Sequence, residues 1–358
     1  MRKLRLCEKL ISPKIVTKDK RMKKIEKIAI VYNEVQQNAG PDELDILDQV
    51  KLAEDCLHEL GYNTCKITVT LDLTKLKKSL FEEKPDIIFN LVESINNNGE
   101  LLYFAPALYN HLRIPYTGVN TEGLFLTTNK PLSKNWMRKN NIPTADWFEL
   151  YETDKLDKNK MYLVKPKLED GSLGFDDDLV FIGADVNKFQ KIKELSPFHF
   201  FIEEYIEGRE FNISVLGGNK GPEVLPIPEM NFNNFPKNKP KIMGFKAKWK
   251  ANSFEYKNTT RSFIDENEEK ELVTKLKNIC IECWESFNLS GFIRVDFRVD
   301  NNGNPFVLEI NANPCITPGS GFYCACEKAN YTFTYAVERL IEDSIKNIQY
   351  LKHEYNFS

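Results

Sequence analysis

The sequence predicts an α/β protein of more than one domain, with α+β architecture in its later part. At 358 residues the chain is too long for one ordinary hydrophobic core. Its first third alternates strand-like and helix-like segments, which favours a parallel sheet covered by helices. Residues 291–314 instead show the period-two pattern of a hairpin, which favours an antiparallel sheet.

Residues 26–118 are predicted to form the first domain, after a basic arm at residues 1–25. Three strand patterns, "KIAIVYN", "CKITVT" and "PDIIFNLVES", are separated by the helical stretches "DELDILDQVKLAEDCLHELGY" and "LTKLKKSLFEE". Ligands of such sheets bind beyond the carboxyl ends of the strands. Those ends lie near Asn33 and Asn90, which makes Glu43 and Glu93 candidate substrate residues.

Residues 119–212 are predicted to form the second domain and residues 213–350 the third. The second contains the helix "NKPLSKNWMRKNNIP", the strand "MYLVKPK", the turn "LEDGSLGFDDD" and two strands, "FHFFIEEYIEG" and "REFNISVLGG". The third contains a polar loop, a helix with a Cys-x-x-Cys pair, the hairpin "GFIRVDFRVDNNGNPFVLEINANP" and a last helix in "YTFTYAVERLIEDSIKNIQYL". The second and third domains therefore mix strands and helices without regular alternation.

The hairpin predicts a metal site. A two-residue turn at Asn302–Gly303 sets Asp296 opposite Glu309 and Arg294 opposite Asn311. Directly opposed Cβ atoms lie about 5 Å apart, and like charges there destabilise a sheet unless something offsets them. Two carboxylates and an amide oxygen suit Mg²⁺. The simpler interpretation is a solvated sheet face on which arginines pair with the acids.

Two other motifs favour a bound nucleotide. Lys165 ends a strand just before the glycine-containing turn at Gly171, whose backbone N–H groups can hold phosphate oxygens. The segment Glu203–Ile206 offers backbone groups to a purine, and Glu210 offers a carboxylate to ribose hydroxyls. Alone, the first reads as an ordinary turn and the second as an exposed acidic hairpin. With the metal site, they describe a bound Mg-nucleoside triphosphate.

The motifs "YLVKPKLEDGSLG", "IEEYIEGREF", "GFIRVDF" and "FVLEINANP", in this order, resemble the ATP-grasp signature of D-alanine-D-alanine ligases. The resemblance extends to "IPYTG", "TTNKPLSK" and "NYTFTYAVERLI", so it covers most of residues 26–345. It implies an ATP-grasp fold of three domains, in which the second and third clamp ATP.

The resemblance also implies roles for single residues. Lys130, Lys165 and Lys248 would contact the phosphate region, with Gly171 and Ser172 in the phosphate loop. The adenine edge and ribose would meet Glu203, Glu204, Tyr205, Ile206 and Glu210. The magnesium ligands would be Asp296, Glu309 and Asn311. Catalysis would involve Arg294, Ser172, Lys248 and Ser320.

The implied reaction uses ATP with two Mg²⁺ ions, or Mn²⁺ in their place. A substrate carboxylate attacks the γ-phosphorus, and an amine then attacks the acylphosphate. Arg294 and the loop from Thr317 to Ser320, which includes Gly319, stabilise the oxyanion. The loops near Gly171 and Trp249 are predicted lids that exclude water.

The sequence departs from the family on the substrate side. "YNEVQQNAGPDELD" replaces a glycine-rich acidic stretch, "LVES" replaces a histidine followed by glycine, and Gly171 stands at a usual serine. Trp249 replaces a tyrosine and Cys315 a glycine. These changes favour an acid other than D-alanine, or a peptide, specialised-metabolite precursor or carrier thiol as acceptor. An ATP-binding protein without catalytic activity is the alternative from another class.

Composition adds limits on partners and location. The net charge of −3 demands no polyanionic partner, although residues 1–27 carry eleven Lys or Arg against three acids. That arm is predicted to be a flexible tail, with nucleic-acid contact as the minority interpretation. No secretory or membrane-spanning stretch is evident, so we expect a cytoplasmic protein without membrane contact. Its partners are small carboxylate and amine substrates, and the resemblance allows a homodimer. Cys280 and Cys283 are expected to be reduced thiols inside a helix.

Overall fold

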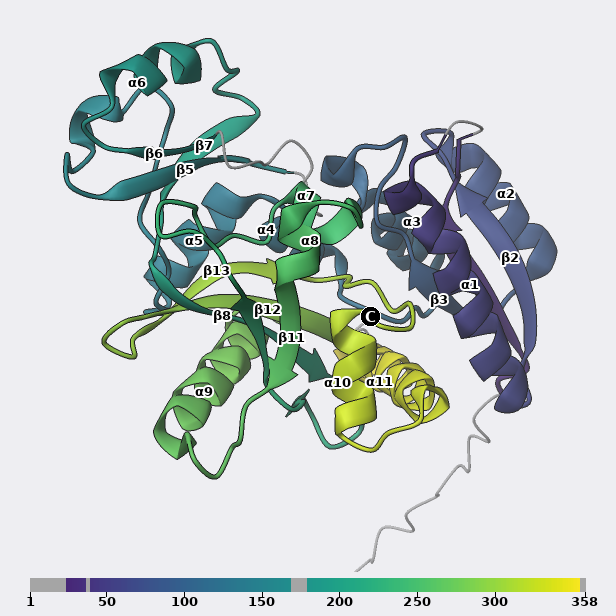
Figure 1. Cartoon of the computed structure of the whole chain (residues 1–358). Helices are drawn as coiled ribbons and strands as arrows, with labels where there is room; N and C mark the ends of the chain where they lie inside the picture. Colours follow the sequence, from purple (N-terminus) through teal and green to yellow (C-terminus); the bar gives the residue numbers. More distant parts are fainter. Residues whose placement is uncertain (1–23, 37–38, 169–178, 355–358) are drawn as a thin grey trace, which may run out of the picture.

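Three β-sheets organise the chain, which this computed structural model describes over residues 24–36, 39–168 and 179–354. The first sheet is parallel, in the order β2-β1-β3. Its strands are β1 (Lys27–Asn33), β2 (Asn63–Val69) and β3 (Ile87–Leu91). Its helices are α1 (Pro41–Glu59), α2 (Leu73–Glu83) and α3 (Phe104–Leu112), with the short helix η1 (Gly99–Leu101) before α3 (Figure 1). The predicted alternation of strand and helix is confirmed here.

The second sheet is antiparallel and small, in the order β4-β7-β5-β6. It consists of β4 (Trp147–Phe148), β5 (Met161–Pro166), β6 (Val180–Ile182) and β7 (Phe200–Glu204), with helices η2 (Thr153–Lys155) and α6 (Val186–Lys193). Helices α4 (Thr121–Thr128) and α5 (Lys130–Lys139) precede it. Asn129 caps α5 through its side chain, which accepts from the N–H of Leu132, and Pro131 fits the first turn because it needs no donor there.

The third sheet is antiparallel, in the order β11-β10-β8-β12-β13 with β9 beside β8. Its strands are β8 (Gly208–Leu216), β9 (Glu223–Val224), β10 (Pro228–Phe232), β11 (Thr259–Phe263), β12 (Phe292–Asp300) and β13 (Pro305–Asn311). Its helices are α7 (Phe245–Trp249), α8 (Phe254–Asn258), α9 (Lys270–Ser286), α10 (Gly321–Lys328) and α11 (Phe333–Glu354). Strand β8 pairs with β12 along its whole length, so the expected boundary at residue 212 lies inside a strand of this sheet.

The hairpin has the predicted register at the site, but the predicted turn is wrong. Asp296 lies opposite Glu309 and Arg294 opposite Asn311. The turn itself has three residues, because the N–H of Asp300 donates to the carbonyl of Asn304 and Gly303 takes a φ of 80°. A β-bulge next to Asp296 inserts Leu308 and restores the register. The extra residue in the turn shifts the pairing by one position, and the extra residue in the bulge shifts it back.

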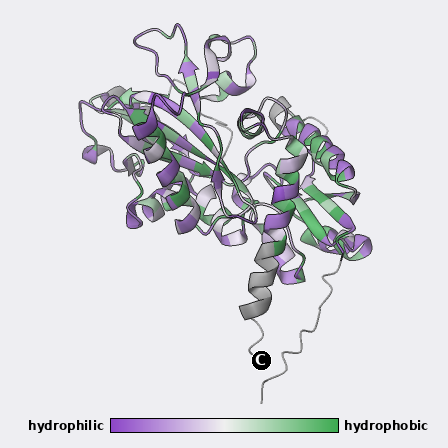
Figure 2. Cartoon of the chain, turned by 90° about the horizontal axis from the view of Figure 1, so that it is seen from below, coloured by the Kyte–Doolittle hydropathy of each residue, from purple (hydrophilic) through white to green (hydrophobic). Residues whose placement is uncertain are grey.

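Two large hydrophobic cores hold the sheets and helices together. One lies between the third sheet and α9, and it contains Cys280 and Cys283. The other joins the first sheet to α10 and α11, so the first domain packs directly on the third. Figure 2 shows hydrophobic residues on the strands and hydrophilic residues on the outer helix faces. All seven cysteines of the described residues are free thiols.

No helix in the described ranges is both long and apolar enough to cross a bilayer.

Candidate active site

A buried chain of charges connects α5 to the second sheet. The N–H of Lys130, at the start of α5, donates to the carbonyl of Lys167 (2.9 Å), just beyond the end of β5. One turn further along α5, the Nζ of Lys134 lies 2.5 Å from one carboxylate oxygen of Glu203, and the Nζ of Lys165 lies 2.6 Å from the other. Neither Lys134 nor Glu203 has more than 1% of its side chain exposed. Lys165 is thus held in place by Glu203 at the edge of the site.

Sequence reasoning missed Lys134. It lies four residues after Lys130, so both are on the same face of α5, and this spacing was the available signal. Burial lowers the pKa of Lys134, although Glu203 opposes that change. For Glu203, burial would raise the pKa, but Lys134 and Lys165 outweigh it and the pKa is lowered. Two lysines therefore share one carboxylate, which leaves positive charge for an anion.

The expected metal ligands lie together at the base of the hairpin. Arg294 donates from Nε and Nη2 to the two carboxylate oxygens of Asp296, at 2.7 and 2.8 Å. The Nζ of Lys130 lies 3.5 Å from Glu309. Burial would raise the pKa of Glu309, but Lys130 and three other cations outweigh it and hold the pKa low. Basic side chains therefore offset the opposed acids, but Asp296 is buried, unlike the solvated sheet face of the simpler interpretation.

The same residues also provide a donor set that fits a hard cation. Asp296 and Glu309 supply carboxylate oxygens, and Asn311 adds an amide oxygen that accepts from the N–H of Asn313 (3.0 Å). Because Arg294 donates to both oxygens of Asp296, a cation there would bind through the lone pairs that Arg294 does not use, or would displace Arg294.

The residues expected at the adenine and ribose differ in their contacts. Glu204 pairs with Lys160 at 2.8 Å, and the N–H of Tyr205 donates to the carbonyl of Met161. Ile206 lies in the short link between β7 and β8. These contacts place the Glu203–Ile206 segment where β7 leaves the second sheet.

Glu210 lies on the face of the third sheet that carries Asp296. It is buried and pairs with Arg298 at 3.1 Å. Burial raises the pKa of Glu210, Arg298 opposes the change, and Asp296 adds to it. Arg298 also lies over the ring of Tyr205 at 5.3 Å.

Lys248, on α7, lies near the charged residues of the hairpin and Glu210. Burial and the neighbouring Arg294 lower its pKa, while Glu309, Asp296 and Glu210 oppose the change. Trp249 is the last residue of α7. The predicted residues Gly171 and Ser172 lie outside the described residues.

The substrate side is a hydrogen-bond network between α1, the end of β3 and the loop after β13. The Sγ of Cys315 donates to Asp45 (3.0 Å), and the N–H of Ile316 donates to the side chain of Gln49 (3.3 Å). Gln49 in turn donates to Asp45 (3.2 Å) and Glu93 (2.9 Å). Burial and the bond to Asp45 raise the pKa of Cys315 to about 12. This network fixes the loop that carries Cys315.

Of the two predicted substrate residues, Glu93 accepts from Gln49 in this network, whereas Glu43 accepts from Asn97 at 3.2 Å. Asp45 and Gln49 were not predicted as site residues. Their spacing of four residues on α1 puts them on one helix face, but the sequence does not say what that face meets.

The loop Thr317–Ser320 leads into α10. Ser320 caps that helix, since its side chain accepts from the N–H of Tyr323. Gly319 has a φ of 86°, a left-handed conformation that favours glycine. Its carbonyl accepts from Arg261 of β11 at 2.9 Å. Arg261 was also missed from the sequence.

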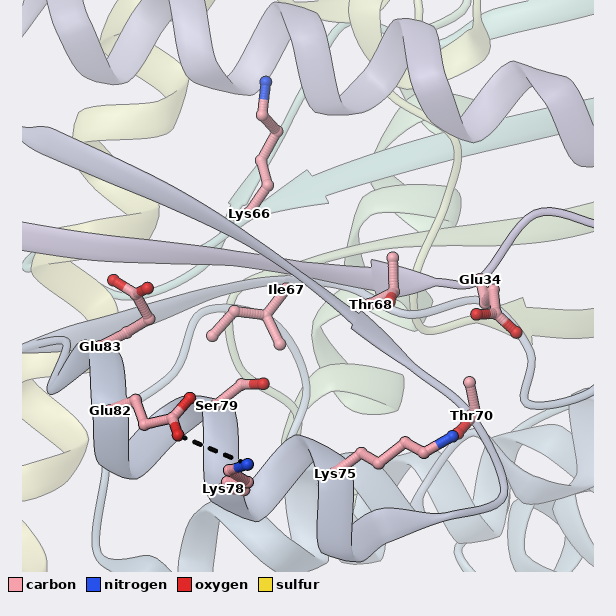
Figure 3. A pocket seen from close by; sticks show the side chains of 10 residues that line it. All are labelled: Glu34, Lys66, Ile67, Thr68, Thr70, Lys75, Lys78, Ser79, Glu82 and Glu83. Carbon is pink, nitrogen blue, oxygen red and sulfur yellow. Dashed lines mark ion pairs between the residues drawn. The ribbon is translucent and has the colours of Figure 1, made fainter.

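A cavity of about 580 Å³ lies elsewhere, between β2 and α2 (Figure 3). Its lining mixes lysines with glutamates, including the pair Lys78–Glu82 at 3.8 Å. None of the predicted site residues lines it.

Comparisons with known proteins agree with the fold and the motifs. The family model described as "D-ala D-ala ligase C-terminus" matches residues 138–342. An uncharacterized protein of Sinorhizobium fredii, y4sG, is 30% identical over 259 residues, which cover 72% of this chain and 74% of that protein. A D-alanine–D-alanine ligase of Rickettsia typhi is 28% identical over 309 residues, covering 84% of this chain and 87% of the relative. The structure of a D-alanine–D-alanine ligase from Bacillus anthracis complexed with ATP has a TM-score of 0.68 at 20% identity, over 90% of this chain and 99% of that one. The expected fold is confirmed.

Proposed function

Because the chain belongs to the D-alanine–D-alanine ligase family of ATP-grasp ligases, we propose that it activates a small carboxylate, an amino acid, as an acylphosphate and couples it to an amine. The observation that carries this proposal is the meeting of four basic residues with two opposed acids in one site: Lys130, Lys165, Lys248 and Arg294 with Asp296 and Glu309. Such a site neutralises a triphosphate and retains charge for a reacting carboxylate.

The lysines bind the phosphates of ATP in this proposal. Lys130 and Lys165 approach from α5 and β5, and Lys248 approaches from α7. Glu203 orients Lys165, and Lys134 keeps Glu203 from neutralising Lys165 completely. The backbone at the end of β7 binds the adenine, and Glu210 lies where the ribose would be.

Asp296, Glu309 and Asn311 would hold Mg²⁺, which supplies positive charge to the phosphate oxygens. Arg294 would share or release Asp296 and direct its guanidinium to the substrate carboxylate. The surrounding lysines and Arg294 hold the pKa of Glu309 low, so its carboxylate is available to a cation.

The reaction proceeds in two steps. A carboxylate oxygen of the donor acid attacks the γ-phosphorus, the bond to the β-phosphate oxygen breaks, and ADP leaves. The neutral amine then attacks the carbonyl carbon of the acylphosphate. Arg294 and backbone N–H groups of Thr317–Ser320 stabilise the oxyanion, which collapses by expelling inorganic phosphate, and the amine loses its proton.

The substrate pair defines a second candidate. An acid other than D-alanine, or a peptide or carrier-thiol acceptor, is favoured by Trp249 and by the network around Cys315. That network fills, with Asp45 and Gln49, the space next to the loop where the family has glycine. An enzyme of specialised metabolism fits such a change.

The deciding experiment is an ADP-release screen with purified protein, ATP and Mg²⁺ against D- and L-amino acids, dipeptides and small carboxylic acids. Release of ADP that depends on one acid and one amine supports the proposal, and mass spectrometry of the product identifies the pair. A D-alanyl-D-alanine product would exclude the second candidate. Tight ATP binding without ADP release under any condition would favour a non-catalytic ATP-binding protein.

A further inference from the structure

Arg261 lies on the active-site face of the third sheet, although it belongs to the edge strand β11. Directly opposed residues of antiparallel strands share a face. Arg261 lies opposite Met230 of β10, Met230 opposite Glu210 of β8, and Glu210 opposite Arg298 of β12. Since alternate residues of a strand share a face, Arg298 lies on the same face of β12 as Asp296 and Arg294. Arg261 therefore faces the catalytic charges.

The guanidinium of Arg261 holds the loop that leads into α10. Its Nη1 donates to the carbonyl of Gly319 at 2.9 Å and approaches that of Ser320 at 3.4 Å. Both acceptors are neutral, and within the described residues the buried Nε has no acceptor. Among those residues no carboxylate forms an ion pair with Arg261 either. Its positive charge is therefore oriented but not neutralised.

The side chain of a second arginine passes the same point. A Cβ atom placed on Gly321, the first residue of α10, would lie 3.6 Å from Cδ of Arg294 and 3.9 Å from Nη2 of Arg261. The start of α10 adds partial positive charge there. Arg294 is paired with Asp296, whereas Arg261 has no carboxylate partner among the described residues, so the charge of Arg261 is the one that is not offset.

Arg294 and the start of α10 suffice for one carboxylate, because a guanidinium and a carboxylate pair through two parallel hydrogen bonds. The positive charge of Arg261 is then available for a second anionic group. We propose that Arg261 determines specificity by selecting an acceptor amine with a second anionic group, such as a dicarboxylic or phosphorylated amino acid. This inference rests on the proposed function, since it names the class of its acceptor.

The experiment measures kcat/KM for pairs of acceptors that differ only in that group: aspartate against asparagine, glutamate against glutamine, and phosphoserine against serine. The donor is the acid found by the ADP-release screen. We expect the wild type to favour the anionic member of at least one pair by about tenfold or more. Arg261→Gln should reduce that ratio to about one, and Arg261→Lys should keep part of it because the charge remains.

The ratio is measured within one preparation, so partial unfolding of a variant does not change it. Arg138→Gln, which removes an exposed arginine that pairs with Asp146, is the matched control and should keep the wild-type ratio. Absence of a preference in the wild type, or an unchanged ratio in Arg261→Gln, would overturn the inference while ADP release still supports the proposed function. No ADP release with any donor would overturn both.

Discussion

The proposed phosphate side and the proposed substrate side of the site are held together in different ways. On the phosphate side, charged residues pair with one another inside the protein, as Lys134, Glu203 and Lys165 do. On the substrate side, mostly uncharged donors join segments far apart in the chain, as Cys315 and Gln49 do. In the proposed function the first arrangement serves ATP binding, whereas the second serves the choice of substrate. Mutations should therefore affect ATP use on one side and substrate choice on the other.

The largest effect is expected at the metal ligands. Asp296→Asn and Glu309→Gln each remove a charge that Mg²⁺ needs, so ADP release should fall by about 100-fold or more. Steady-state ADP release with the best acid and amine measures this. Asp300→Asn, on the same strand but in the turn, is the control and should keep most activity. If both site variants keep activity within about threefold of wild type, then Asp296 and Glu309 are not metal ligands.

The buried charges on the phosphate side predict the next effect. Lys134→Met leaves Glu203 with one lysine and should cost about 3 kcal/mol or more of unfolding free energy, measured by urea denaturation. ATP binding should weaken too, because Lys165 is then neutralised by Glu203. Lys78→Met removes an exposed pair with Glu82 and should change stability by less than about 1 kcal/mol.

The double variant Lys134→Met with Glu203→Leu sharpens this test. It removes both buried charges, so much of the stability should return while Lys165 loses its orienting partner. If Lys134→Met alone is as stable as wild type, then Glu203 does not depend on it.

On the substrate side, Asp45→Ala should cost about 1 kcal/mol of stability, because it removes the acceptor of Cys315. The KM for the amino-acid substrates should rise several-fold, and the dissociation constant of ATP, measured by calorimetry, should stay within about twofold. Asp48→Ala, an exposed position on the same helix, is the control. A larger change in ATP affinity than in substrate KM would contradict the division between the two sides.

The smallest effect concerns pH. Since the pKa of Cys315 is about 12 in the folded protein and about 8.5 in an unfolded chain, the folded state favours the protonated thiol. Its stabilising contribution is therefore present below pH 8.5 and is lost as pH rises toward 12. At pH 8 iodoacetamide should modify Cys315 at least about 100-fold more slowly than an exposed thiol, as peptide mass spectrometry can measure. Fast modification would show that Asp45 does not hold the proton.

The fold and the register at the base of the hairpin could be predicted because local patterns determine both. Period-two alternation predicted β12 and β13. The predicted register put Asp296 opposite Glu309, where their like charges must be offset. The missed residues have a common physical cause. Lys134, Gln49 and Arg261 act through contacts with segments distant in the chain, and helix or strand periodicity gives the face but not the neighbour. The residues of the proposed phosphate side lie within short motifs, whereas the proposed substrate side depends on how α1 docks.

The bulge at Leu308 separates the length of the hairpin loop from the register at its base. Without the bulge, a three-residue turn would shift β13 by one position and turn Glu309 and Asn311 to the opposite face of the sheet. A residue gained or lost at the exposed tip, Asn301–Gly303, can be compensated by one gained or lost at the bulge. Asp296 and Glu309 then stay opposed. Natural or engineered insertions at this tip are therefore a route to change the outer surface without altering the chemistry.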